Sequence, residues 1–176
     1  MRLLGERLAG LLRAGDLVVL AGSLGAGKTT LVQGIGEGLG VRGPITSPTF
    51  VIARLHPALG DGPDLVHADA YRLDSRLEVD DLDLDADLDH SVTVVEWGEG
   101  LVENLAAAHL LVTIERPGPT QPRTAGTELA GPRGLRSPAP GGAADDEVRT
   151  VTLTGYGERW AATAGALDAV VAAPLR

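Results

Sequence analysis

Apolar residues follow two spacings along the chain, one typical of buried strands and one typical of amphipathic helices. Leucines and isoleucine recur at helical spacing in residues 3–13 and 29–39, which predicts two helices. Gly15 is expected to end the first of them. Short apolar runs that predict strands lie at 17–21, 65–69, 92–97 and 109–115. This alternation of strands and helices predicts an α/β domain with a mainly parallel sheet.

The second predicted helix carries three glycines, Gly34, Gly36 and Gly38. Each glycine inside a helix costs up to ~1 kcal/mol relative to alanine. Close packing of this helix against the sheet is our hypothesis for what offsets that cost.

The second half of the chain has a different composition. Residues 117–147 are dense in Pro, Gly, Ala, Ser and Thr and carry almost no large apolar side chain, which predicts a disordered insertion. A returning strand is predicted at 149–154, so the insertion lengthens a hairpin connection that extends the sheet in antiparallel fashion. A final helix is predicted over 158–173, and a weakly alternating strand over 50–55.

Length and charge limit the class of protein. The 176 residues suit one domain, so we expect 1–176 to fold as a single unit. The formal net charge of −9 gives no general attraction for nucleic acid. No apolar run approaches the ~18 residues of a membrane span, so none is expected. The absence of cysteine is compatible with a reducing cytosol, and we expect a cytoplasmic protein.

A glycine-rich loop directly follows the first predicted strand and opens the second helix. It fits the phosphate-binding pattern G-x-x-x-x-G-K-[ST] at every fixed position. Glycines allow backbone N–H groups to converge on phosphates, and the helix directs its positive dipole end at the anion. Lysine then reaches the β- and γ-phosphates, and the threonine hydroxyl ligates Mg²⁺. The nucleotide-binding candidates here are Gly22, Leu24, Gly25, Ala26, Gly27, Lys28, Thr29 and Thr30.

Two acids stand where predicted strands end, and either fits the need of such a loop for a second Mg²⁺ contact. Glu96 follows the apolar run at 92–95, which is the pattern of a metal-ligating acid at a strand end. Asp69 ends the strand at 65–69, where spacing alone does not separate a functional acid from a solvated one. Trp97 follows Glu96 directly, and position alone leaves open a functional or a structural role.

Four motifs in order resemble the TsaE family, also called YjeE, an ATPase family of bacterial threonylcarbamoyladenosine tRNA modification. They span Leu24–Thr30, Ser47-Pro48-Thr49-Phe50, His67–Leu73 and Val95-Glu96-Trp97. The resemblance covers roughly residues 3 to 116 and implies a three-layer P-loop NTPase fold.

The resemblance also implies roles for individual positions. Thr29 and Glu96 would hold Mg²⁺, and Asp69 would lie near the γ-phosphate and matter for hydrolysis. Ser47 to Thr49 would form a switch-like loop that faces ATP, and Trp97 would act beside the site. Lys28, Asp69 and Glu96 are therefore the predicted catalytic residues.

Partners follow from the same resemblance. Relatives act on a complex of TsaB and TsaD, in which TsaD modifies the tRNA, and ATP hydrolysis supports repeated turnover. No direct tRNA binding by this chain is expected. The family often carries Asp where this chain has Ser23, and relatives begin before the first helix. Arg149 aligns with a nucleotide-contacting arginine of relatives, across an insertion without a counterpart.

Two other functions compete with this one. A small P-loop kinase needs an acceptor pocket and an arginine-rich lid, whereas the arginines here are scattered and the long flexible segment is of low complexity. A non-catalytic nucleotide-binding module would bind ATP without turnover. The set of Lys28, Thr29, Asp69 and Glu96 favours the ATPase.

Overall fold

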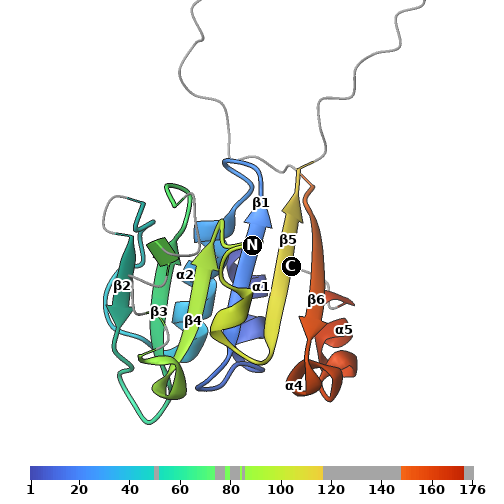
Figure 1. The fold of residues 1–176 in the computed structure, drawn as a ribbon. Coiled ribbons are helices and arrows are strands. Elements are labelled where there is room, and N and C mark those ends of the chain that lie inside the picture. Colours follow the sequence, from blue (N-terminus) through green and yellow to red (C-terminus); the bar gives the residue numbers. More distant parts are fainter. Residues whose placement is uncertain (50–51, 74–77, 80–83, 85, 117–147, 173–176) are drawn as a thin grey trace, which may run out of the picture.

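The computed structural model describes residues 1–49, 52–73, 78–79, 84, 86–116 and 148–172. Within them, a six-stranded sheet has the strand order β2-β3-β4-β1-β5-β6 (Figure 1). Its strands are β1 (Leu17–Gly22), β2 (Ala53–His56), β3 (Asp64–Asp69), β4 (Ser91–Glu96), β5 (His109–Glu115) and β6 (Thr150–Tyr156).

The centre of the sheet is parallel and both edges are antiparallel. β1 lies between β4 and β5 and runs parallel to both, and β3 runs parallel to β4. β6 pairs antiparallel with β5, and β2 pairs antiparallel with β3. The predicted mainly parallel sheet with an antiparallel extension beside residues 117–147 is confirmed. That segment itself, predicted to be disordered, lies outside the described residues.

Four helices of the described residues lie beside this sheet. They are α1 (Arg2–Ala9), α2 (Lys28–Leu39), α4 (Glu158–Ala161) and α5 (Ala164–Ala172), and two short 3-10 helices are η1 (Leu88–His90) and η2 (Glu103–Leu105). α1 and α2 lie together behind the sheet in Figure 1. None of the helices in the described part of the chain is long and apolar enough to cross a bilayer.

The sheet is covered on both faces, which explains the continuous apolar strands. On the helix face, Val18 and Val94 pack with Leu8 of α1 and Leu31 of α2. On the other face, alternate strand residues such as Val19 pack with the segments that precede η1 and flank η2. Both sides of β1 and β4 are therefore buried, and the predicted three layers are present.

The helical glycines pack differently from our hypothesis. A Cβ on Gly34 would lie 1.9 Å from the carbonyl oxygen of Arg2 in α1, and one on Gly38 would lie 2.5 Å from Cβ of Ala9. A Cβ on Gly36 would lie 2.0 Å from Cδ1 of Ile45. The three glycines thus permit close approach of α1 and of the 41–45 loop, rather than of the sheet.

Two predicted helices have different bounds. The first ends at Ala9, short of the predicted residue 13, and continues as a turn with bonds from Leu11 N to Leu8 O and Leu12 N to Ala9 O. The last is divided into α4 and α5. Thr163 Oγ1 donates to the Arg159 carbonyl at 2.7 Å. This hydroxyl therefore competes for the carbonyl that would accept a backbone N–H in a continuous helix.

The strand predictions hold with small shifts. Both the 65–69 and 109–115 strands are present, and the 92–97 strand ends at Glu96, one residue earlier than predicted. The strand predicted at 149–154 begins at Thr150 and extends to Tyr156. The weak 50–55 prediction corresponds to β2, whose first residue is Ala53, while residues 50–51 lie outside the described part.

Candidate nucleotide-binding site

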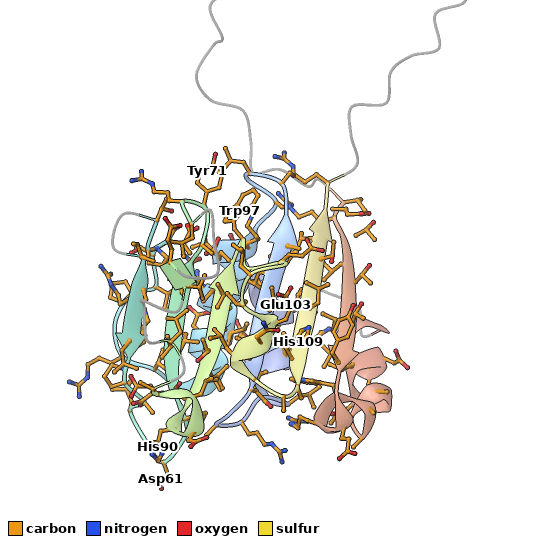
Figure 2. The ribbon with its side chains drawn as sticks, viewed as in Figure 1. Asp61, Tyr71, His90, Trp97, Glu103 and His109 are labelled. Carbon is orange, nitrogen blue, oxygen red and sulfur yellow. The ribbon has the colours of Figure 1, made fainter. Side chains whose placement is uncertain are left out.

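Parallel strands bring the predicted acids to the same edge of the sheet as the glycine-rich loop. β1 ends at Gly22, β3 at Asp69 and β4 at Glu96, and Asp69 stands opposite Glu96 in the register. Figure 2 shows Tyr71 and Trp97 at this same edge, just beyond the strand ends. The site is therefore built where three strands terminate together, the usual ligand position of an open α/β sheet.

The loop between β1 and α2 depends on glycine. Gly22, Gly25 and Gly27 have φ of 138°, 74° and 107°, in the region that disfavours other residues. A Cβ on Gly22 would also lie 2.3 Å from the Ile114 carbonyl oxygen. Gly27 is the N-cap of α2, and no side-chain hydrogen bond caps it. The first amides of α2 are thus left for an anion, which the helix dipole also favours.

A cavity of about 440 Å³ lies over this loop. Every predicted site residue lines it except Gly22 and Arg149, which lie beside it. Tyr71 joins them as a lining residue that sequence reasoning did not select. The full lining is Leu24, Gly25, Ala26, Gly27, Lys28, Thr29, Thr30, Ser47, Thr49, Asp69, Tyr71, Glu96 and Trp97.

Lys28 is buried at the base of the cavity, and it is the single lysine of the sequence. Its Nζ donates to the carbonyl oxygens of Gly22 at 2.8 Å and Ser23 at 3.1 Å. The same atom lies 3.5 Å from the centre of the Trp97 ring. Burial lowers the pKa of Lys28 below its usual range, while the charges of Glu96 and Asp69 act in the opposite direction.

Thr29 and Glu96 meet directly. The Thr29 hydroxyl donates to Glu96 Oε1 at 2.8 Å, and the carboxylate is buried at 3% exposure. A hydroxyl and a carboxylate at this spacing are the oxygen ligands that Mg²⁺ takes together with nucleotide phosphates. His67 of β3 contacts the same Oε1 from the other side, with its Nε2 at 2.9 Å.

Asp69 holds the loop that carries Ser47 and Thr49. Its Oδ2 accepts hydrogen bonds from Thr49 Oγ1 at 2.6 Å and Ser47 Oγ at 3.1 Å. Its Oδ1 accepts the backbone N–H of Tyr71 at 3.0 Å. The structure thus brings the predicted switch-like loop to the predicted catalytic acid, although the two are about twenty residues apart in sequence.

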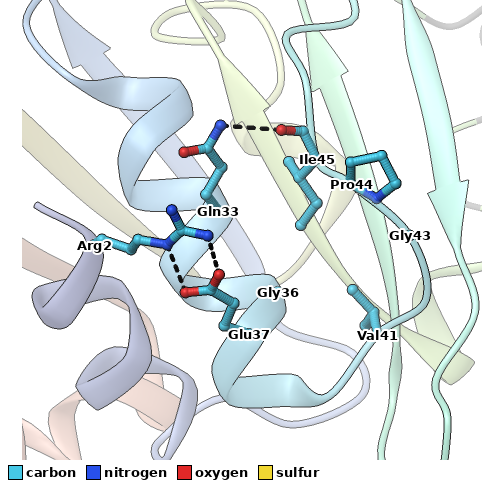
Figure 3. Close-up of a pocket in the computed structure, with 8 residues that line it drawn as sticks. All are labelled: Arg2, Gln33, Gly36, Glu37, Val41, Gly43, Pro44 and Ile45. Atoms are coloured by element: carbon cyan, nitrogen blue, oxygen red, sulfur yellow. Dashed lines mark hydrogen bonds and ion pairs between the residues drawn. The ribbon is translucent and has the colours of Figure 1, made fainter.

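The segment before Ser47 is fixed to α2. Gln33 Nε2 donates to the Ile45 carbonyl at 3.0 Å. Figure 3 shows this contact in a second cavity, of about 200 Å³, beside the ion pair of Arg2 and Glu37. The loop is therefore tied to α2 at one point and to Asp69 at another, and α2 begins in the phosphate-binding motif.

Two aromatic rings and two arginines flank the cavity. Trp97 adopts a left-handed backbone with φ of 62°, and its ring centre lies 5.1 Å from that of Tyr71. Arg149 Nε donates to the Ala26 carbonyl at 3.0 Å, so the predicted arginine does reach the loop. Arg116, which we did not predict, has its Nη1 3.3 Å from where a Cβ on Gly25 would lie. In the sequence, the feature that could have indicated Arg116 was its position directly after the predicted 109–115 strand.

A glycine-rich G-x-x-x-x-G-K-T loop between a central strand and a helix, with acids on neighbouring strand ends, defines the class of P-loop nucleotide-binding proteins. The fold agrees with the crystal structure of YdiB from Bacillus subtilis, with a TM-score of 0.63 and 28% identity. The similarity covers 96% of this chain and 86% of that one.

The chain belongs to the TsaE family, because the family model for the threonylcarbamoyl adenosine biosynthesis protein TsaE matches residues 1–124. A Streptomyces coelicolor protein named for this function is 60% identical over 92% of this chain and 94% of its own length. A Mycobacterium tuberculosis relative is 54% identical over 69% of this chain and 77% of its own. The Bacillus subtilis relative is 40% identical over 60% and 65%. The family role is in tRNA threonylcarbamoyladenosine biosynthesis.

Proposed function

We propose that this chain is a Mg²⁺-dependent ATPase that acts with TsaB and TsaD in tRNA threonylcarbamoyladenosine modification. Family membership supports the pathway. The observation that carries the ATPase is the 2.8 Å contact between the Thr29 hydroxyl and the buried Glu96 carboxylate, at the start of α2 and beside Lys28. The motif alone is shared by many nucleotide-binding proteins, whereas this contact joins it to a buried acid that is suited to bind Mg²⁺.

The residues present fit both groups. Gly22, Gly25 and Gly27 give the loop a positive-φ backbone that other residues disfavour. No side-chain hydrogen bond caps the N-terminus of α2, which leaves its first amides for phosphate. Mg²⁺ usually binds through one or two protein oxygens together with substrate phosphates. Thr29 and Glu96 supply such a pair. The donor set is hard oxygen throughout, which suits Mg²⁺ better than a softer transition metal.

In the proposed reaction, the side chains chiefly position charge. Lys28 binds the β- and γ-phosphates, and Thr29 and Glu96 hold the cation. Asp69 orients the attacking water through a carboxylate that already accepts two hydroxyl hydrogen bonds. Mg²⁺, when bound, neutralises charge that develops on the phosphoryl oxygens. Burial of the acids strengthens all of these electrostatic effects.

TsaB and TsaD are proposed as partners that complete the site. With a net charge of −9, this chain has no general attraction for tRNA, so the partner complex would hold the tRNA. Ser47 and Thr49 donate hydrogen bonds to Asp69 in the free chain. A partner that favours another loop position would remove these hydrogen bonds from the Asp69 carboxylate. Such a shift of loop population would make turnover depend on the partners.

The test measures Mg-ATP hydrolysis by the chain alone and with TsaB and TsaD from the same source. Lys28→Ala and Glu96→Gln should abolish turnover, because they remove a phosphate contact and a metal ligand. Glu99→Gln is the matched control, since Glu99 is an exposed acid three residues from Glu96. Turnover that rises with the partners and requires Lys28 supports the proposal.

Two other outcomes oppose it. ATP binding without turnover in either state would leave a nucleotide-gated binding module. Full turnover by the chain alone would refute activation by the partners.

A further inference from the structure

His67 lies buried in β3 with no exposed surface, two residues before Asp69. Residues two apart in a strand share a face, so both side chains are directed to the α2 side, where Leu65 also packs. His67 Nε2 lies 2.9 Å from Glu96 Oε1. A carboxylate can only accept, so the proton of this hydrogen bond is on Nε2.

We propose that His67 is a positioning residue for Mg²⁺: its Nε2–H fixes the Glu96 carboxylate in the orientation that pairs it with Thr29. This inference rests on the proposed ATPase function and deepens it. Thr29 of α2 and His67 of β3 donate to one oxygen, Oε1, from two different elements. Two donors on one oxygen restrict rotation of the carboxylate, and its Oε2 receives no hydrogen bond from the described residues.

A purely structural role for His67 explains the contacts less well. Its Nδ1 is buried and has no hydrogen-bond partner among the residues that the structure describes. A buried polar atom without a hydrogen-bond partner destabilises the folded state. An apolar side chain at this core position would avoid that cost. The hydrogen bond to Glu96 is the interaction that a leucine could not replace, and hydrogen-bond donors behind metal ligands typically set metal affinity.

The experiment compares His67→Leu with His67→Gln, whose side-chain amide keeps a donor near the position of Nε2. His56→Gln is the matched control, because His56 is also buried, at 4% exposure, but lies on β2 and outside the cavity lining. ADP is bound to each protein in EDTA, and Mg²⁺ is then added in excess of the EDTA while tryptophan fluorescence is followed as a function of free Mg²⁺. Thermal unfolding is measured for every variant.

We expect His67→Leu to raise the Mg²⁺ concentration for half-saturation by about 10- to 100-fold, the usual effect of removing such a partner. ADP affinity in EDTA should stay unchanged, because the phosphate contacts remain. His67→Gln should recover most of the Mg²⁺ response, and His56→Gln should match the wild type. A folded His67→Leu protein with the wild-type Mg²⁺ response would overturn the inference.

Failure of the proposed function looks different, because the wild type itself would then show no effect of Mg²⁺ on ADP binding. Should His67→Leu not fold, ¹⁵N NMR of the wild-type histidines decides the question. A proton on Nε2 of His67, with a resonance that moves when Mg²⁺ joins bound ADP, supports the inference. A proton on Nδ1, or a resonance indifferent to Mg²⁺, overturns it.

Discussion

Alanine at Gly34 should destabilise the protein, although alanine is the better helix former. A Cβ at this position would lie 1.9 Å from the Arg2 carbonyl oxygen and 3.0 Å from its Cα. Both are backbone atoms of α1, so no flexible side chain can move aside. An ordinary van der Waals contact is about 3.5–4 Å long. The two helices would therefore have to separate by more than 1 Å.

Two opposing terms set the change in the free energy of unfolding of Gly34→Ala. Alanine contributes about 1 kcal/mol through helix propensity. Overpacking a close contact costs typically 1–3 kcal/mol, and a contact with rigid backbone belongs at the upper end. The net loss is about 2 kcal/mol, which corresponds to a fall in Tm of about 4–8 °C for a chain of this length.

Gly165 is the matched control, because it lies in α5 and a Cβ there would meet nothing within 4 Å. Gly165→Ala should gain up to about 1 kcal/mol from propensity alone. Thermal unfolding and urea titration of both variants measure the difference. A Gly34→Ala protein that melts at or above the wild type would refute the reasoning, as would equal losses in both variants.

Three further predictions concern other parts of the molecule. Arg159→Leu should lower the free energy of unfolding by about 3 kcal/mol in urea titration, because it removes the charged partner that binds the buried Asp16 carboxylate at 3.0 and 3.1 Å. A second change, Asp16→Asn, should add less than its own cost, and full additivity would contradict the pairing. Burial lowers the pKa of His56 below 6.5, so the unfolded state takes up this proton first. Stability should therefore fall as pH drops below about 6.5 and level off below the folded pKa, and His56→Gln should flatten this part of the stability–pH curve. Mg-ATP should change the fluorescence of Trp97, which lines the cavity, and Trp97→Phe should remove the change while the buried Trp160 still emits.

The sequence by itself determined the phosphate-binding loop and the central strands. The loop follows from local chemistry, since glycines, lysine and threonine must stand at fixed spacing for the backbone to surround a phosphate. Continuous apolar runs indicated strands covered on both faces, because a half-buried strand would alternate. The strand-end position of Glu96 and Asp69 then placed both acids at the edge of the sheet that carries the loop.

Only the tertiary structure decided which side chains meet. His67 opens one of the motifs that resemble the TsaE family, but its contact could not be predicted, because its partner Glu96 lies 29 residues away on the adjacent strand. The position of Arg116 after a predicted strand was visible in the sequence, but its approach to the loop depends on the pairing of β5 with β1. The structural reason for Gly34 could not be predicted from the sequence either. Its cost is local, whereas the close approach of α1 that offsets this cost exists only when the two helices pack together.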